Sequence, residues 1–248
     1  YKRQVKISDR VMHSLIEGYT REAGVRTLER TIAKVIRKAA VTMLDEGETD
    51  VTVTEKVLHQ YLGAPRFTRE LPEKEPRVGI VNGLAYTTVG GETLEVECLT
   101  MPGKGGLRLT GQLGDVMKES ATTAITCIRT RAETLGISPD FYAKKDIHIH
   151  APEGAVPKDG PSAGIAMATA VTSALCEEPI AHDIAMTGEI TLQGRVLPIG
   201  GLREKSMAAY KNGMKTVIIP HGNIADLAEI DQVVKDNVRF VPVRRIDE

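Results

Sequence analysis

The chain has 248 residues, of which 42% are hydrophobic and 26% charged, as expected for a globular protein with a sizeable core. Its formal net charge of −1 gives no general reason to expect a nucleic-acid or anionic-membrane partner. The three cysteines, Cys98, Cys127 and Cys176, contain no C-x-x-C pair, so they predict neither a disulfide framework nor a zinc site and fit a reducing compartment. No apolar run approaches the ~20 residues that span a bilayer, and no signal-peptide pattern opens the chain. Because the chain begins with Tyr1, we expect a piece of a longer polypeptide.

The first part of the chain has helical patterns. "SDRVMHSLIEGYTREAG" has an N-cap at Ser8 or Asp9 and a stop at Gly24, and "VRTLERTIAKVIRKAAVTMLDEG" closes at Gly47. A short strand, "DVTVT", and a helix ending in "HQYLG" follow. The next stretch, "APRFTRELPEKEPR", is rich in proline and charge without apolar periodicity, as is typical of a linker. We therefore expect a small all-α subdomain with its linker over residues 1–76.

Residues 77–248 alternate strand and helix signals. Strands are predicted in "GLAYTTVGGETLEVECLTMPG", with a turn at Gly90-Gly91, and in "GLRLTG", "DIHIHAP", "KTVIIP" and "VRFVPV". "DIAMTGEITLQGRVLPIG" reads as a strand pair. Helices are predicted in "DVMKESATTAITCIRTRAETLG", "SAGIAMATAVTSALC", "LREKSMAAYKNG" and "NIADLAEI". The pattern predicts a mixed α/β (α+β) domain of about 170 residues.

Residues 160–164 match G-x-S-x-G, a spacing that exposes a nucleophilic serine in many hydrolases. Ser162 begins an apolar helix, where unpaired N–H groups and the positive dipole end suit an oxyanion. The alternative role is an N-capping serine. A strand–turn–helix elbow does not fit, because about ten loop residues separate the strand ending near His150 from Ser162. The pattern alone therefore leaves a nucleophile and a cap both open.

A Ser-His-Asp hydrolase remains an alternative interpretation. In the order Ser, acid, His, the histidine follows the serine, and His182 and His221 meet that condition. Each borders a loop, and neither has an obvious group to position it.

Lys205 suggests a different base. Its helical neighbours are Leu202, Ala208 and Ala209, so it lies on a small apolar face near a helix start. Desolvation and the positive dipole end both lower a lysine pKa, and a neutral amine can serve as general base for a serine. The alternative is a lysine whose stem covers apolar surface while its ammonium reaches water. Together with Ser162, the pattern favours a Ser–Lys dyad.

Three segments, "PEGAVPKDGPSAG", "MTGEITLQGRVLPIGGLREK" and "DIHIH", resemble the proteolytic domain of Lon, an ATP-dependent protease family of bacteria and mitochondria. The resemblance runs from about Gly111 to Pro220 without an apparent gap. It implies a serine endopeptidase with Ser162 as nucleophile and Lys205 as base.

The same resemblance implies supporting roles for other residues. Thr187 of "MTGE" helps to hold the lysine, and His148, His150, Asp159 and Glu97 arrange or gate the site. Asp159 also fits a capping or turn acid. The two histidines face one side of their strand, but no third metal ligand is evident, so we expect a hydrogen-bonded pair and no metal.

The helical segment resembles the small helical domain that closes the ATPase module of the same family. "REAGVRTLER" matches its second sensor motif, which makes Arg26 the candidate contact to a nucleotide phosphate; a solvated arginine is the alternative. The phosphate loop G-x-x-x-x-G-K-[ST] does not occur, and "PGKGGLRLTG" reads as a turn between strands. We expect no cofactor for this chain itself, and ATP with Mg²⁺ in the full-length protein.

Residues 1–44 carry ten Lys or Arg against four acids. Such a basic face can bind DNA through phosphates, or it can be solvated or docked on an absent ATPase core. A DNA-binding or assembly module without catalysis is therefore another alternative. The resemblance implies unfolded or damaged proteins as substrates and a hexameric ring. Because the sequence has no apolar span, we expect no membrane partner. We expect the bacterial cytoplasm rather than the mitochondrial matrix.

Overall fold

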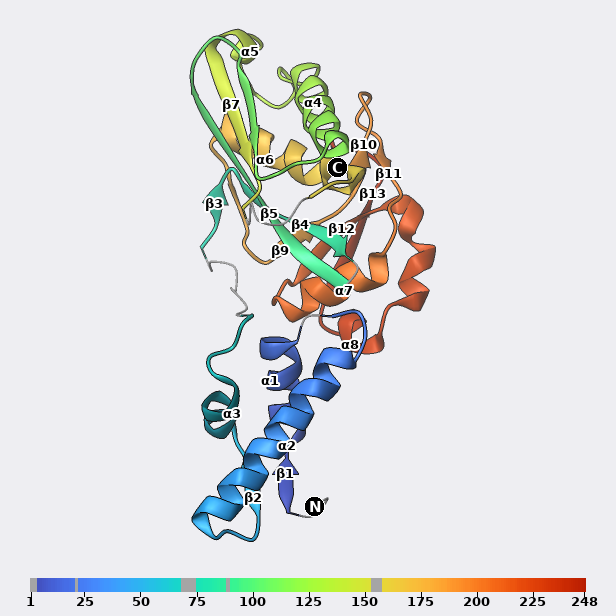
Figure 1. Ribbon diagram of the computed structural model, residues 1–248. Helices are drawn as coiled ribbons and strands as arrows, with labels where there is room; N and C mark the ends of the chain where they lie inside the picture. The colour runs from blue at the N-terminus through green and yellow to red at the C-terminus, as the bar shows by residue number, and fades with distance from the viewer. Residues whose placement is uncertain (1–3, 21, 68–74, 88–89, 153–157) are drawn as a thin grey trace. The chain divides into compact units, whose positions relative to one another are not determined.

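The structure is a computed structural model that describes residues 4–20, 22–67, 75–87, 90–152 and 158–248. The chain divides into two compact units, Tyr1–Glu70 and Leu71–Glu248, which are described separately. Figure 1 shows the elements of both units along the chain. In the described parts of the chain, no helix is both long enough and apolar enough to cross a membrane.

The first unit consists of three helices and a two-stranded parallel sheet. Apolar side chains of all five elements, among them Leu15, Val35 and Leu58, form its core. The strand predicted in "DVTVT" is present, and its partner near the N-terminus was not predicted. The elements are α1 (Asp9–Tyr19), α2 (Arg26–Glu46), α3 (Glu55–Leu62), β1 (Val5–Ile7) and β2 (Val51–Val53).

Local hydrogen bonds explain where these helices begin and end. The Ser8 hydroxyl accepts from the backbone N–H of Val11, which confirms the predicted N-cap of α1. Gly24 is not the stop, because the helix already ends at Tyr19. Gly47 ends α2 in the left-handed conformation, as predicted from the sequence.

The second unit is built on a seven-stranded sheet with the order β13-β12-β9-β4-β5-β7-β6. The four strands from β13 to β4 are mutually parallel, and β5 runs antiparallel to both of its neighbours. Its strands are β4 (Ile80–Thr87), β5 (Gly90–Pro102), β6 (Leu107–Thr110), β7 (Lys145–His150), β9 (Ile184–Met186), β12 (Thr216–Pro220) and β13 (Arg239–Val243).

The remaining elements of the second unit are helices and short strand pairs. The segment "NIADLAEI", predicted as a helix, forms 3₁₀ turns followed by a short helix. The helices are α4 (Asp115–Arg129), α5 (Phe141–Lys144), η1 (Pro161–Ala163), α6 (Gly164–Cys176), α7 (Leu202–Lys211), η2 (His221–Asn223), η3 (Ala225–Glu229) and α8 (Gln232–Lys235). The strand pairs are β3 (Arg77–Val78) with β8 (Pro179–Ile180) and β10 (Glu189–Ile190) with β11 (Val196–Leu197).

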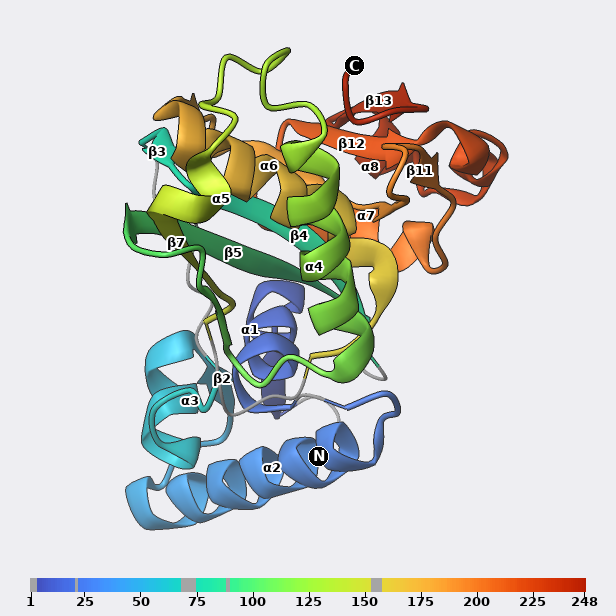
Figure 2. The same cartoon turned by 90° about the horizontal axis from the view of Figure 1, so that it is seen from above.

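Helices cover both faces of the sheet. Adjacent strand residues point to opposite faces, and Met186 belongs to the core under α4 and α6 whereas Ala185 belongs to the core under α7. Figure 2 shows α4 and α6 side by side over β4 and β5. The mixed α/β architecture predicted from the sequence is confirmed. It brings the start of α6 and the start of α7 to the carboxyl end of the parallel strands β4 and β9, where α/β sheets usually place their ligands.

One turn differs from the sequence prediction. Gly90 and Gly91 are the first residues of β5 and pair with Thr87 and Tyr86 of β4. The connection of this hairpin is therefore residues 88–89, outside the described residues.

Candidate active site

Ser162 is the middle residue of η1, a 3₁₀ helix of one turn that leads directly into α6. Neither η1 nor α6 has a side-chain cap hydrogen bond, so the structure excludes the capping role for this serine. The loop between β7 and η1 is long, as predicted, and an elbow turn is absent from its described residues. The half-buried Ser162 side chain contributes to the wall of a cavity of about 180 Å³.

Two backbone hydrogen bonds fix the start of α6 against the turn after β9. Gly188 N–H donates to the carbonyl of Ser162 at 2.8 Å, and Ile165 N–H donates to the carbonyl of Gly188 at 3.0 Å. Thr187 follows β9 directly, and its own N–H donates to Ile218 of β12 at 3.1 Å. The serine is thereby attached to the central parallel strands.

Lys205 reaches the same place from α7. Its side chain is only 3% exposed, and the predicted neighbours Leu202, Ala208 and Ala209 are buried with it. The amine therefore does not extend to water as a lysine does when only its stem is buried. Burial lowers the pKa of Lys205 to about 8 because desolvation disfavours the ammonium form. Lys205 lines the same cavity as Ser162.

Thr187 connects the two residues. Its side chain is fully buried, and its hydroxyl accepts from Lys205 Nζ at 3.3 Å and donates to the carbonyl of Ser162 at 3.4 Å. A neutral amine that donates one hydrogen to Thr187 keeps its lone pair for another partner in the cavity. A neutral amine of this kind can act as a general base toward a hydroxyl in the same cavity.

Asp159 caps a different helix from the one that follows it in sequence. Its Oδ1 accepts from the backbone N–H of Met117 at 3.1 Å, in the first turn of α4, and from Gly160 N–H at 2.9 Å. Gly114, the N-cap residue of α4, leaves room for the carboxylate because a Cβ there would lie 2.3 Å from Asp159 Cγ. Asp159 also lines the cavity. Its contacts are those of a capping acid that fixes the loop before Ser162.

The other predicted supporting residues lie on the outer strands. Thr110 of β6 shares its hydroxyl between His148 Nε2 at 2.9 Å and His150 Nδ1 at 2.7 Å, and Glu97 pairs with His150 in the β5–β7 register. The two histidines thus share Thr110 as a hydrogen-bond partner, whereas the expected pair was one beside the site. None of Glu97, His148 and His150 lines the cavity. In the part of the chain that the structure describes, no three His, Cys, Asp or Glu side chains gather as a metal site.

The two alternative histidines lie elsewhere. His221 Nε2 lies 2.7 Å from Arg244 Nη2, and His182 is held near β9 by its backbone carbonyl, which accepts from Asn82 Nδ2. Neither lines the cavity that holds Ser162. Arg26, the candidate nucleotide contact, is exposed at the first position of α2.

The sequence patterns did not indicate that the β4–β5 hairpin forms one wall of the cavity. Its residues lie about 75 positions before Ser162 and contain no catalytic motif, so only the sheet pairing could have revealed them. The hairpin residues that line the cavity are Leu84, Ala85, Tyr86, Thr87, Glu92, Thr93 and Leu94.

Comparison with protein families identifies the class of this chain. Residues 52–248 match the model of the Lon protease (S16) C-terminal proteolytic domain, and residues 1–56 match that of the Lon protease AAA+ ATPase lid domain. These matches define a serine peptidase domain preceded by an ATPase lid. The chain belongs to the Lon protease family.

Individual relatives agree with the family models. The chain is 53% identical to Lon protease of Heliobacterium modesticaldum over 247 residues, 51% identical to Lon protease 1 of Bacillus subtilis over 247 residues and 53% identical to Lon protease of Escherichia coli K12 over 248 residues. Each alignment covers 100% of this chain but only 30 to 32% of the relative. The chain thus spans about a third of the length of these curated relatives.

Proposed function

We propose that this chain is the proteolytic part of an ATP-dependent protease, with Ser162 as nucleophile and Lys205 as general base. The observation that carries the proposal is the buried amine of Lys205 in the cavity of Ser162, joined to the serine backbone through Thr187. A pKa of about 8 leaves a useful fraction of neutral amine near neutral pH.

The reaction begins when the Lys205 amine accepts the Ser162 hydroxyl proton and the serine oxygen attacks a peptide carbonyl. Backbone N–H groups at the start of η1 and α6 stabilise the oxyanion, since a helix start leaves such donors without intrahelical partners. The ammonium then returns its proton to the leaving amine. Water, activated by the same lysine, hydrolyses the acyl-enzyme.

The test is cleavage of an unfolded protein without ATP by wild type, Ser162→Ala, Lys205→Gln and His182→Ala. We expect the first two variants to lose cleavage by at least about a thousandfold, because nucleophile and base act as a unit. His182→Ala should stay near wild type because this histidine lies outside the cavity. Loss with His182→Ala and retention with Lys205→Gln would favour the Ser-His-Asp hydrolase instead.

We further propose two domains, residues 1–76 as the lid subdomain with its linker and residues 77–248 as the proteolytic domain. Arg26 is the proposed contact to a nucleotide phosphate. The sequence does not contain G-x-x-x-x-G-K-[ST], so these residues do not by themselves form an ATP and Mg²⁺ site. ATP and Mg²⁺ are therefore proposed only for the full-length protein.

The whole protein is proposed to form a hexameric ring that degrades unfolded, misfolded and regulatory proteins as part of quality control and the stress response. The bacterial origin of the compared relatives supports the bacterial cytoplasm as its location. Sedimentation of the full-length protein, with and without nucleotide, tests the ring.

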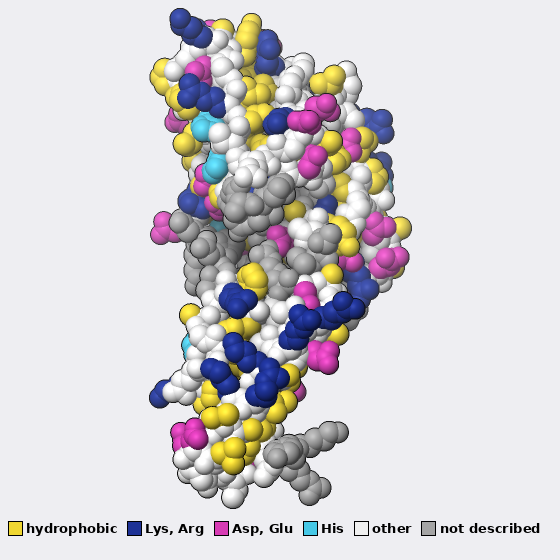
Figure 3. All heavy atoms as spheres, in the orientation of Figure 1, with side chains coloured by type: hydrophobic (Ala, Val, Ile, Leu, Met, Phe, Trp, Pro, Cys, Tyr) yellow, Lys and Arg dark blue, Asp and Glu magenta, His cyan; other side chains and the backbone are white. Residues whose placement is uncertain are grey.

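DNA binding is a second candidate function, favoured by the basic face of α2. Figure 3 shows Lys and Arg side chains gathered along this helix. The exposed basic residues are Arg26, Arg30, Lys34, Arg37 and Lys38. If they contact phosphates, affinity for duplex DNA falls steeply with salt, and charge reversal along α2 removes that dependence. Salt-independent or absent binding would instead indicate a solvated or docked face.

A further inference from the structure

Gly91 has no room for a side chain. A Cβ built on it would lie 2.0 Å from the carbonyl oxygen of Glu204, 2.4 Å from the carbonyl carbon and 2.9 Å from the backbone nitrogen of Lys205. All three atoms belong to the backbone of α7, so no rotamer change could relieve the overlap. The backbone of Gly91 is not in the left-handed region, so the requirement for glycine here is one of space alone.

This contact lies directly beneath the residue that carries the proposed base. Glu204 and Lys205 lie in the first turn of α7, and β5 passes under them. At the other end of the helix, Asn212 Nδ2 donates to Thr93 Oγ1 of β5 at 3.0 Å. Two contacts between α7 and β5 are therefore specific: the Asn212–Thr93 hydrogen bond and, nearer to Lys205, the close approach of the helix backbone to Gly91.

We propose that Gly91 is a positioning residue for Lys205: its missing side chain lets α7 approach β5 closely enough to bury the Lys205 amine beside Thr187 and Ser162. The inference rests on the proposed function of Lys205 as general base. A larger residue displaces the first turn of α7, lets water reach the amine and moves it away from the Thr187 hydroxyl.

Burial, rather than a charge partner, holds the pKa of Lys205 low, so loosening the helix should raise it. The charged or titratable groups around Lys205 come from every element that packs near it. The cavity of Lys205 is lined by Tyr86 of β4, Glu92 of β5, and Lys158 and Asp159 before η1, and the neighbouring pocket beside Gly91 is lined by Arg203, Glu204 and Lys211 of α7 and Asp231 before α8. Arg203 pairs with Asp231 at 3.1 Å.

The test compares wild type, Gly91→Ala and Gly200→Ala in the 248-residue chain. Gly200 precedes the same helix, but a Cβ there would meet nothing within 4 Å, so Gly200→Ala is the matched control. The pKa of Lys205 is measured by NMR on protein with ¹³C-labelled lysine, with the signal assigned from Lys205→Arg. The pH dependence of kcat/KM for peptide cleavage is measured in parallel.

We expect the Lys205 pKa to rise by at least one unit in Gly91→Ala, which lowers the neutral amine about tenfold at pH 7. Cleavage at pH 7 should fall by the same factor and recover as the pH is raised. A variant that is merely less folded would lose activity equally at every pH. An unchanged Lys205 pKa, or a uniform loss with an unshifted profile, would overturn the proposal.

A second variant keeps the test independent of the folding of Gly91→Ala. If that protein does not fold, Asn212→Ala loosens α7 from the other end: a raised Lys205 pKa supports the proposal, and an unchanged one overturns it. The NMR titration also separates this inference from the proposed function. Suppose that the wild type cleaves no substrate but the pKa of Lys205 still rises in Gly91→Ala. The role of Gly91 in positioning Lys205 would then hold, and the role of Lys205 as general base would be refuted.

Discussion

At the scale of single residues, Lys205 shows how burial changes the chemistry of one side chain. An exposed lysine is an ammonium at neutral pH, whereas burial lowers the pKa of Lys205 to about 8. Desolvation is the only cause of this shift, so its size depends on how closely α7 packs on the sheet. The reactivity of the residue is therefore set by the fold around it.

The pH dependence of cleavage should report this group. In the proposed mechanism the neutral amine is the active form, and its fraction rises as the pH increases through about 8. We expect kcat/KM to increase about tenfold per pH unit below that value and to level off above it. Measurement between pH 6 and 10 checks the prediction, and a profile that is flat across this range would contradict it.

Burying this lysine should also reduce stability. The folded lysine titrates near pH 8, whereas the unfolded lysine remains charged to about 10.5. Below about pH 8 the folded state therefore holds a buried ammonium, which costs free energy. The unfolded state binds more protons between these values, so the lysine's destabilising effect lessens as the pH rises through this window.

Lys205→Met should therefore raise the free energy of unfolding at pH 7 by about 1–3 kcal/mol while abolishing cleavage. Lys211→Met, at the exposed end of the same helix, should change it by less than about 0.5 kcal/mol. Urea unfolding of both variants provides the comparison. Equal effects of the two substitutions would show that burial of Lys205 carries no cost.

At the scale of elements, α4 depends on an acid from a distant loop. Its N-cap residue, Gly114, has no side chain, and Asp159 supplies the missing acceptor through Met117 N–H. One carboxylate thus accepts from one of the unpaired donors at the start of α4 and from the Gly160 N–H just before Ser162. The supporting role that the resemblance implied for Asp159 stays a prediction, and these contacts offer a physical basis for it.

Asp159→Ala should lower the free energy of unfolding by about 1–2 kcal/mol because the cap and its favourable charge at the helix start are both lost. Cleavage should fall as well, because the loop before Ser162 loses its anchor. Asp159→Asn keeps an acceptor oxygen and should cost less in both measurements. A larger loss for Asn than for Ala would contradict the capping explanation.

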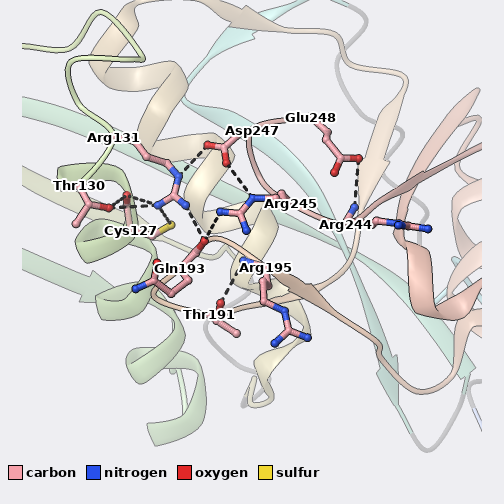
Figure 4. A network of polar contacts seen from close by, with 10 residues as sticks. All are labelled: Cys127, Thr130, Arg131, Thr191, Gln193, Arg195, Arg244, Arg245, Asp247 and Glu248. Carbon is pink, nitrogen blue, oxygen red and sulfur yellow. Dashed lines mark hydrogen bonds and ion pairs between the residues drawn. The ribbon is translucent and has the colours of Figure 1, made fainter.

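At the scale of the whole molecule, the C-terminal residues of the second unit form hydrogen bonds with segments that lie far away in the sequence. Figure 4 shows Arg131, after α4, donating to Asp247 and to the carbonyl of Gln193. These bonds measure 2.8 and 2.7 Å, and Arg245 donates to the same carbonyl at 2.8 Å. The loop between β10 and β11 is thereby tied to both the end of the chain and α4.

Arg131→Lys should lower the free energy of unfolding by about 1–2 kcal/mol, because a lysine cannot reproduce the fork of donors that reaches several acceptors at once. Arg195→Lys, on the exposed side of the same loop, is the matched control and should have an effect near zero. Thermal and urea unfolding measure both. Equal values would show that the network adds nothing beyond charge.

The sequence by itself predicted most of the element types and the candidate catalytic residues. The alternating patterns predicted the mixed α/β unit. Ser8 begins α1 and Gly47 ends α2 as predicted, and G-x-S-x-G together with a lysine among alanines pointed to Ser162 and Lys205. These signals are local, since caps, turns and amphipathic faces depend on residues three or four positions apart.

Only the tertiary structure decided which of these residues meet. Sheet order placed Thr187 between Ser162 and Lys205 and left His148, His150 and Glu97 outside the cavity. It also joined Asp159 to α4 and brought Gly91, more than a hundred positions away, against the backbone of Lys205. Such contacts arise from strand pairing and helix packing between distant segments, and neither leaves a periodic trace in the sequence.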